Sequence, residues 1–154
     1  MHWSFHEGEL DRPDVRDLLA QHFAEMRAGS PPSACHVMPA GALADSAIRF
    51  VTLRDGDGTL LGCGALKRLE PGHGEIKSMR TAYHALGRGV GGAVLGQLTL
   101  IACADGLNRL SLETGNSAMF AAANRLNQSE GFVLCGPFAD YRANDFTTFY
   151  TREI

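Results

Sequence analysis

The stretch Leu86-Gly87-Arg88-Gly89-Val90-Gly91-Gly92 places four glycines within seven residues and runs directly into the apolar segment 93–102. Glycine leaves the backbone bare, and the amides at the start of a helix attract anions. The pattern therefore predicts a loop that leads into a helix and presents backbone amides to an anionic group such as a pyrophosphate.

The segment before the glycines, residues 74–83, predicts an unusually polar strand. Between positions 75 and 81 only Ile76 and Met79 are apolar. Such a strand either lies at the edge of a sheet or turns its polar groups toward a cleft.

Hydrophobic spacing predicts the remaining elements. Strands are expected around residues 3–5 and at 48–52, 60–69, 109–114, 131–138 and 146–151, and helices at 13–27, from the glycines to about 106, and at 118–128. A short helical turn is expected at 40–44, a hairpin turn at 55–58 and a proline-containing loop at 28–34, long enough to line a site. Asp11 is expected to cap the first helix, whose apolar positions are Val15, Leu18, Leu19, Phe23 and Met26.

Length and composition predict one folded domain over residues 1–154, because 45% of the residues are hydrophobic and 20% are charged. A formal net charge of -3 argues against a nucleic-acid partner. The N-terminus lacks the pattern of a signal peptide and no apolar run is long enough to span a bilayer, so a cytoplasmic protein without a membrane partner is expected. The four cysteines form no Cys-x-x-Cys pair and are expected to be reduced and buried.

The glycine loop alone is compatible with several functions. A dinucleotide site requires a buried strand before the glycines and an acidic residue about 20 positions later, a place that Glu113 comes close to filling. The preceding strand is polar, however, and three antiparallel-looking strands come before it. No Lys-Ser/Thr pair follows the glycines, so a nucleotide P-loop is not available. The remaining alternatives are a pyrophosphate loop beside a catalytic strand and glycines that merely allow tight packing.

Several motifs together resemble small bacterial members of the GNAT N-acetyltransferase superfamily. They are Gly74-Glu75-Ile76-Lys77-Ser78-Met79-Arg80-Thr81, the glycine loop, Leu110-Ser111-Leu112-Glu113-Thr114-Gly115, Glu130-Gly131-Phe132 and Gly136-Pro137-Phe138-Ala139-Asp140-Tyr141. The resemblance covers the chain from about residue 10 to its end. It implies a mixed α/β GNAT fold with a central, mostly antiparallel sheet of six to seven strands, in which the fourth and fifth strands splay apart and helices cover both faces.

The resemblance also implies acetyl-coenzyme A as the acetyl donor, bound along the polar strand and the glycine loop. The implied cofactor-binding residues are Met79, Arg80, Thr81, Leu86, Gly87, Arg88, Gly89, Val90, Gly91, Gly92 and Asn127. Two of them depart from the superfamily pattern. Leu86 stands where the loop signature has Arg or Gln, and Asn127 stands where many relatives have a tyrosine.

The chemistry implied by the resemblance is direct transfer of an acetyl group to a primary amine of a small molecule or peptide. Glu75 is the expected general base, and Tyr141, Tyr83 or water replaces the missing tyrosine as the proton donor. A domain that binds acyl-CoA without catalysis is the alternative. The histidines have no metal-ligand spacing, so no metal site is expected. Carboxylates in the segment 140–145 would suit a cationic amine, and a homodimer is expected by analogy.

Overall fold

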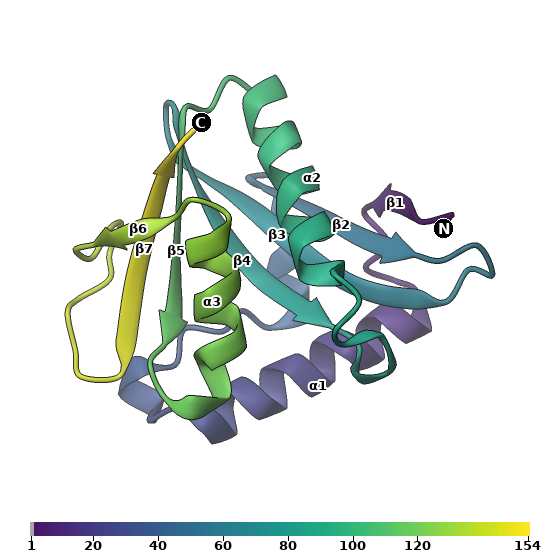
Figure 1. Cartoon of the computed structure of the whole chain (residues 1–154), viewed down its shortest axis with the longest axis horizontal. Helices are drawn as coiled ribbons and strands as arrows, with labels where there is room; N and C mark the ends of the chain where they lie inside the picture. The colour runs from purple at the N-terminus through teal and green to yellow at the C-terminus, as the bar shows by residue number, and fades with distance from the viewer. Residues whose placement is uncertain (1) are drawn as a thin grey trace.

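The computed structural model describes residues 2–154. In this part of the chain seven strands form one sheet in the order β1-β2-β3-β4-β5-β7-β6 (Figure 1). The strands are β1 (Ser4–Glu7), β2 (Ile48–Arg54), β3 (Leu60–Glu70), β4 (His73–Thr81), β5 (Arg109–Gly115), β6 (Val133–Cys135) and β7 (Thr147–Glu153). The α-helices are α1 (Pro13–Gly29), α2 (Val90–Ala104) and α3 (Ala121–Ser129), with short 3-10 turns at Pro32–Ala34, Ala40–Ala44, Tyr83–Ala85 and Ala118–Phe120.

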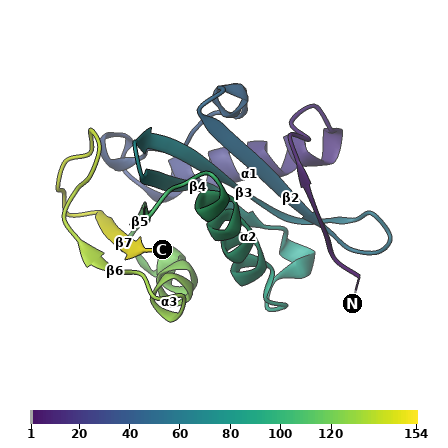
Figure 2. The same ribbon diagram turned by 90° about the horizontal axis from the view of Figure 1, so that it is seen from above.

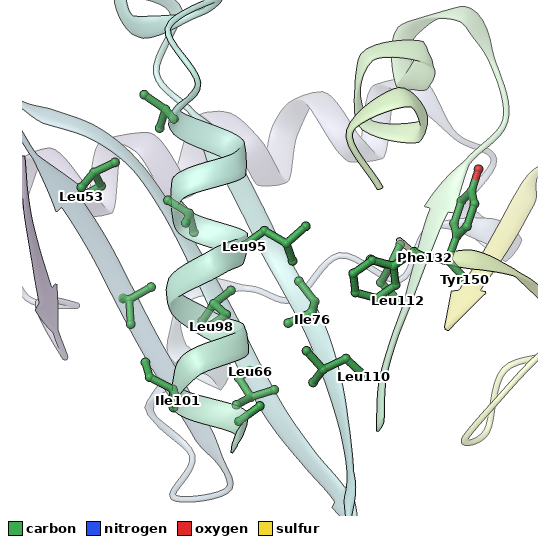
Figure 3. Packing of buried hydrophobic residues seen from close by; sticks show 14 of the residues in the cluster. Leu53, Leu66, Ile76, Leu95, Leu98, Ile101, Leu110, Leu112, Phe132 and Tyr150 are labelled. Atoms are coloured by element: carbon green, nitrogen blue, oxygen red, sulfur yellow. The ribbon is translucent and has the colours of Figure 1, made fainter. Parts of the chain in front are cut away.

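The helices cover both faces of the sheet, as predicted. Helix α1 lies on one face, and α2 and α3 lie on the other (Figure 2). The larger core packs α2, through Leu95 and Leu98, against Leu66 and Ile76 of the sheet (Figure 3). A second core packs Leu18 and its neighbours on α1 against the opposite face. None of the helices between residues 2 and 154 has both the length and the apolar character that crossing a membrane requires.

Strands β4 and β5 are parallel and stay paired only at their first three residues. His73–Glu75 pair with Arg109–Ser111, and beyond that point the two strands diverge. All other neighbouring strands within residues 2–154 are antiparallel. The polar strand β4 is therefore central rather than at an edge, and its polar groups face the opening between β4 and β5.

A bulge in β4 sets the direction of its side chains. Cys63 pairs with Arg80 and Ala65 with Lys77, so Ser78 and Met79 together oppose Gly64. Ser78 has a φ of 54°. A bulge adds one residue and re-aims the side chains that follow it. Because Ile76 and Met79 pack into the core beneath α2, Glu75, Lys77 and Arg80 all face the α1 side of the sheet.

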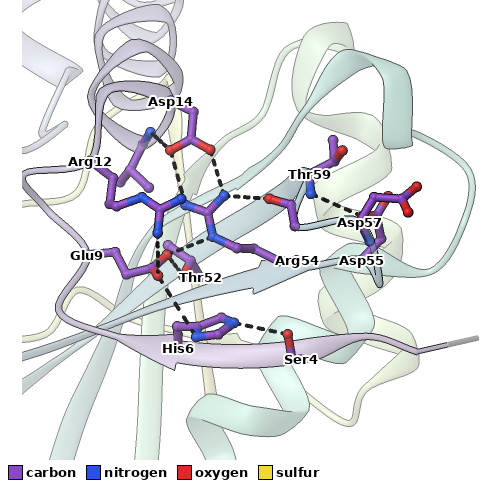
Figure 4. A network of polar contacts seen from close by, with 12 residues as sticks. Ser4, His6, Glu9, Arg12, Asp14, Thr52, Arg54, Asp55, Asp57 and Thr59 are labelled. Carbon is purple, nitrogen blue, oxygen red and sulfur yellow. Dashed lines mark hydrogen bonds and ion pairs between the residues drawn. The ribbon is translucent and has the colours of Figure 1, made fainter.

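A buried arginine ties α1 to β2. The Arg54 guanidinium donates hydrogen bonds to Glu9, Asp14 and the carbonyl of Gly58, and its side chain is only 4% exposed (Figure 4). The Gly58 carbonyl belongs to the predicted hairpin turn, in which the Asp55 carboxylate accepts the backbone N–H groups of Asp57 and Thr59. The hydrogen bonds of Arg54 thus join the start of α1, the end of β2 and the turn into β3.

Several local predictions are wrong at the ends of elements. Asp11 does not cap α1, because Pro13 is its first residue and Arg12 occupies the N-cap position without a side-chain hydrogen bond. His22, rather than Phe23, is buried on the inner face of α1. The extended segment 131–138 pairs as a strand only at Val133–Cys135, and the Gly136-Pro137 pair that follows cannot continue the ladder because proline lacks an N–H.

The four cysteines are free, as predicted, but they are not all buried. Cys63 is buried, Cys35 and Cys135 are partly exposed, and Cys103 is exposed. Cys103 lies on α2, a helix that is apolar around most of its circumference. In such a helix, apolar neighbours in sequence do not indicate which face is buried.

Candidate active site

A cavity of about 740 Å³ opens where β4 and β5 diverge. Its walls come from the glycine loop, β4, β5, α3, the second half of α1 and the loop at residues 30–38. The proline-containing loop therefore lines the site, as expected. The glycine loop and the catalytic candidate Glu75 both line this cavity, whereas Tyr141 lies outside its wall.

The glycine loop presents bare backbone to the cavity. Gly87 and Gly89 have φ angles of 76° and 84°, and a Cβ on either would meet no atom within 4 Å. Gly89 is the N-cap of α2, and no side chain caps this helix. The first amides of α2 therefore have no helical acceptors and can bind an anion. Gly91 serves packing instead, since a Cβ there would lie 2.9 Å from Leu126 of α3.

Most of the predicted cofactor-binding residues line this cavity. They are Met79, Arg80, Thr81, Leu86, Gly87, Gly89, Val90, Gly91, Gly92 and Asn127. Arg88 differs from the rest, because its guanidinium carbon lies 5.8 Å from the centre of the Trp3 ring. The Arg80 side chain forms an ion pair with Glu25 of α1, and Glu25 also accepts a hydrogen bond from Tyr83.

The structure brings the two catalytic candidates into direct contact. The Tyr141 hydroxyl donates to Glu75 Oε2 at 2.5 Å, and Lys77 Nζ donates to both, at 2.7 Å to the Tyr141 oxygen and 3.1 Å to Glu75 Oε2. Glu75 is only 2% exposed. Tyr141 comes from the long loop between β6 and β7, where its ring packs against Phe138 and Phe149. Tyr83 is not part of this cluster.

Two further residues complete the polar end of the cavity. Glu113 of β5 lies across the opening, and its Oε2 is 3.5 Å from Nδ1 of His36. The His36 ring makes an edge contact with Tyr141, with ring centres 4.9 Å apart. One end of the cavity is thus lined by residues from two strands and one loop, namely Glu75, Lys77, Glu113 and His36. Tyr141, from the β6–β7 loop, contacts Glu75, Lys77 and His36 without lining the cavity itself.

Burial shifts the pKa values of several groups along the cavity. Burial is the largest cause that raises the pKa of Tyr141, and the charge and hydrogen bond of Glu75 raise it further. Burial also raises the pKa of Glu113, although His36 and Lys77 oppose the shift. The pKa of His22 falls to about 4, because burial and the nearby charge of Arg80 disfavour its protonation.

Comparisons with known proteins identify the family. The sequence model of the Acetyltransferase (GNAT) family matches residues 12–132, which is most of the chain. The chain belongs to this family. It is 41% identical over 146 residues to the uncharacterized N-acetyltransferases YedL of Escherichia coli (strain K12) and YsnE of Bacillus subtilis (strain 168). The match covers 95% of the present chain, 91% of YedL and 96% of YsnE.

The fold of this acetyltransferase also matches solved structures. A GNAT family acetyltransferase from Elizabethkingia anophelis with acetyl-CoA bound aligns with a TM-score of 0.71 and 20% identity, over 99% of both chains. The dinucleotide alternative is therefore wrong. A Rossmann domain needs a doubly wound, mostly parallel sheet, whereas only β4 and β5 are parallel neighbours within residues 2–154.

Sequence reasoning missed part of the site of this acetyltransferase. From the sequence, Lys77 is only one polar residue of the strand, and His36 is only one of the histidines without metal-ligand spacing. Glu113 is only part of the Leu110–Gly115 motif and of the discarded dinucleotide hypothesis. The polar character of strand 74–83 is a signal for Lys77. His36 and Glu113 carry no comparable local signal, because their proximity depends on how the 30–38 loop folds over β5.

Proposed function

We propose that this protein is an acetyl-CoA-dependent N-acetyltransferase that transfers an acetyl group to a primary amine of a small molecule or peptide by direct attack. The main support is one cavity lined both by the uncapped, glycine-rich N-terminus of α2 and by Glu75 and Lys77, which hydrogen-bond to Tyr141 beside the cavity. Such a cavity combines an anion site with a proton-accepting group.

The residues present fit coenzyme A. The amides of the glycine loop and the N-terminus of α2 would hold its pyrophosphate, where Gly87 and Gly89 leave space that a side chain would occupy. Beyond Glu75, no strand within residues 2–154 pairs with the β5 side of β4, so the backbone of Met79 and Thr81 would pair with the extended pantetheine arm. Acetyl-CoA supplies the acetyl group as a reactive thioester.

Glu75 and Tyr141 are proposed to move the protons. An ammonium group loses two protons when it becomes an amide nitrogen, one to a base and one that ends on the departing sulfur. Glu75 would accept the first. Once protonated, Glu75 no longer contributes the negative charge that raises the pKa of Tyr141. The hydroxyl of Tyr141 would then be a better acid, able to release its proton to the departing sulfur and to take up the proton held by Glu75. The regenerated Glu75 carboxylate would accept the second proton of the amine.

Tyr141→Phe tests this relay. The variant keeps the aromatic packing and removes the hydroxyl, so kcat is expected to fall by about 100-fold, the lower end of the general acid–base range. Tyr83→Phe is the matched control, because its hydroxyl contacts Glu25 and not Glu75. Equal losses in both variants, or a loss only in Tyr83→Phe, would assign the proton donor elsewhere.

The activity itself is tested by calorimetry and a thiol-release assay. Acetyl-CoA is expected to bind and NAD is not, and acetyl-CoA is expected to release thiol only when a suitable amine is present. Asn127, buried in the cavity wall at the position where relatives carry tyrosine, favours the second candidate, a domain that binds acyl-CoA without turnover. Binding without thiol release across a broad amine panel would support that alternative.

Gly89→Ala tests the pyrophosphate loop. A non-glycine residue at a φ of 84° is strained, so the loop is expected to lose its anion-binding shape and acetyl-CoA affinity to fall by about 5–30-fold, the equivalent of roughly 1–2 kcal/mol. Gly96→Ala is the control, since Gly96 lies inside α2 with open space around it. Unchanged affinity in Gly89→Ala, measured by calorimetric titration, contradicts the assignment.

A cytoplasmic location and a homodimer belong to the same proposal. Fractionation of cells that produce the protein tests the first, and size-exclusion chromatography with light scattering tests the second.

A further inference from the structure

Two carboxylates that line the cavity, Glu25 and Glu113, have no part in the proposed reaction. Glu25 is paired with Arg80 and Tyr83, which leaves Glu113 to be explained. Glu113 lies on β5 two residues beyond Ser111, the last residue of β5 that pairs with β4. Leu112 packs into the core beneath α2, so Glu113 faces the α1 side of the sheet, as Glu75 does. The carboxylate therefore lines the opening between the two diverging strands.

The basic neighbour of Glu113 is His36, and the two side chains do not form a hydrogen bond with each other. His36 Nδ1 lies 3.5 Å from Glu113 Oε2, and this buried nitrogen has no hydrogen-bond partner. The Glu113 side chain is only 18% exposed. A half-buried carboxylate and an imidazole nitrogen thus face the cavity at a spacing that an N–H donor could bridge. A buried polar group without a partner is costly, and a cationic ligand would remove that cost.

The positive side chains on the cavity wall are already matched. Lys77 pairs with Glu75, and Arg80 pairs with Glu25. An acceptor that carried its own carboxylate would have to displace one of these ion pairs. The neighbouring wall adds apolar surface from Met26, Val37 and Met38. The polar end of the cavity is therefore suited to a cation on an apolar body.

We propose that Glu113 and His36 form the subsite for the ammonium group of the acceptor, and that the acceptor is a primary amine with no carboxylate beside the amine. This inference rests on the proposed N-acetyltransferase function. It narrows the acceptor to simple amines and disfavours α-amino acids. Glu75 remains the proposed proton acceptor, while Glu113 supplies the charge that holds the amine.

Matched amines test the substrate class. We would compare 2-phenylethylamine with phenylalanine, and 3-methylbutylamine with leucine, because the members of each pair differ only by the carboxylate. The expected kcat/KM with acetyl-CoA is at least about tenfold higher for the amine than for the amino acid. The carboxylate of the amino acid would lose its water without gaining a cationic partner, and this loss weakens binding. Equal or better use of the amino acids overturns the inference.

Glu113→Gln tests the subsite itself. We expect the KM for the better amine to rise by roughly tenfold or more, because a hydrogen bond to a charged group is lost, while the affinity for acetyl-CoA stays within about twofold. Glu113→Asp, which keeps the charge, should recover part of the loss. Glu70→Gln is the control, because the Glu70 side chain is 70% exposed and lies outside the cavity.

The outcomes separate the two proposals. If acetyl-CoA does not bind, the proposed function fails. If acetyl-CoA binds and wild-type protein acetylates amines, but Glu113→Gln leaves the amine KM unchanged, only the subsite is wrong. Calorimetric titration of the CoA-bound protein with 2-phenylethylamine and 3-methylbutylamine gives a readout without turnover. If neither amine binds, the subsite is wrong even though the cofactor site is intact.

Discussion

Glu75→Gln is expected to lower kcat by about 100–1,000-fold, within the range for removing a general base. Glutamine has the same shape and can still accept hydrogen bonds from Tyr141 and Lys77, but it cannot take up a proton from the amine. The change also leaves the Lys77 ammonium without its anionic partner inside a site where Glu75 is almost fully buried. Steady-state thiol release, measured from pH 6 to 9 at saturating acetyl-CoA, checks the prediction.

The controls for Glu75→Gln separate chemistry from folding and binding. Calorimetric affinity for acetyl-CoA should stay within about threefold of wild type, a change of less than 1 kcal/mol, because Glu75 lies at the other end of the cavity from the glycine loop. Glu70→Gln, an exposed substitution one strand away, should keep full activity. Turnover that is unchanged across this pH range would show that Glu75 is not the base.

Local patterns predict much of this fold and the glycine-loop half of the candidate site. The glycines mark the start of α2 because φ angles such as those of Gly87 and Gly89 favour glycine. Both catalytic candidates, Glu75 and Tyr141, turn out to touch although 66 residues separate them in sequence. Their roles came from a family resemblance rather than from spacing, and neither role is tested by the fold.

The remaining half of the site depends on tertiary structure. His36 and Glu113 meet because the loop at residues 30–38 brings His36 to β5. Apart from the short 3-10 turn at Pro32–Ala34 this loop has no repeating pattern from which its path could be predicted. The bulge at Ser78 also has no signal in the sequence, yet it places Lys77 and Arg80 on the same face of the sheet, the α1 side. Serine is not the residue expected at a positive φ, so no turn motif marks the position.

The splay of β4 and β5 connects these observations. Strands that stop pairing leave backbone N–H and C=O groups without ladder partners, and they leave room beside those groups. Here the divergence begins immediately after Glu75 and Ser111, so the carboxylate of Glu75 lies at the apex of the opening and Glu113 lies on its far wall. The same divergence that leaves the edge of β4 open thus places two carboxylates beside the opening.

Arg54→Met is expected to lower the free energy of unfolding by about 3 kcal/mol at pH 7, at the lower end of the range for breaking a buried ion pair, because Asp14 can return to water. The Arg54 side chain is only 4% exposed, whereas that of Asp14 is 43% exposed. For a domain of this size the loss corresponds to a fall in Tm of roughly 6–12 °C. Arg12→Met is the control, because Arg12 also contacts Glu9 but is 52% exposed, and it should cost less than about 1 kcal/mol.

The loss in Arg54→Met should depend on pH. The hydrogen bond from Arg54 holds the pKa of Asp14 below its ordinary 3.8. Burial alone would raise the pKa of Glu9, but hydrogen bonds from Thr52 and Arg54 outweigh it and hold the value below 4.5. Carboxylates with lowered pKa values stabilise the fold above their unfolded-state pKa, and this stabilisation disappears as the pH falls through the folded-state values. The difference between wild type and Arg54→Met, measured by urea unfolding, should therefore be full near pH 7 and shrink below about pH 4.5. A difference that is constant between pH 7 and 3 would mean that Arg54 stabilises the fold through packing rather than through its charge.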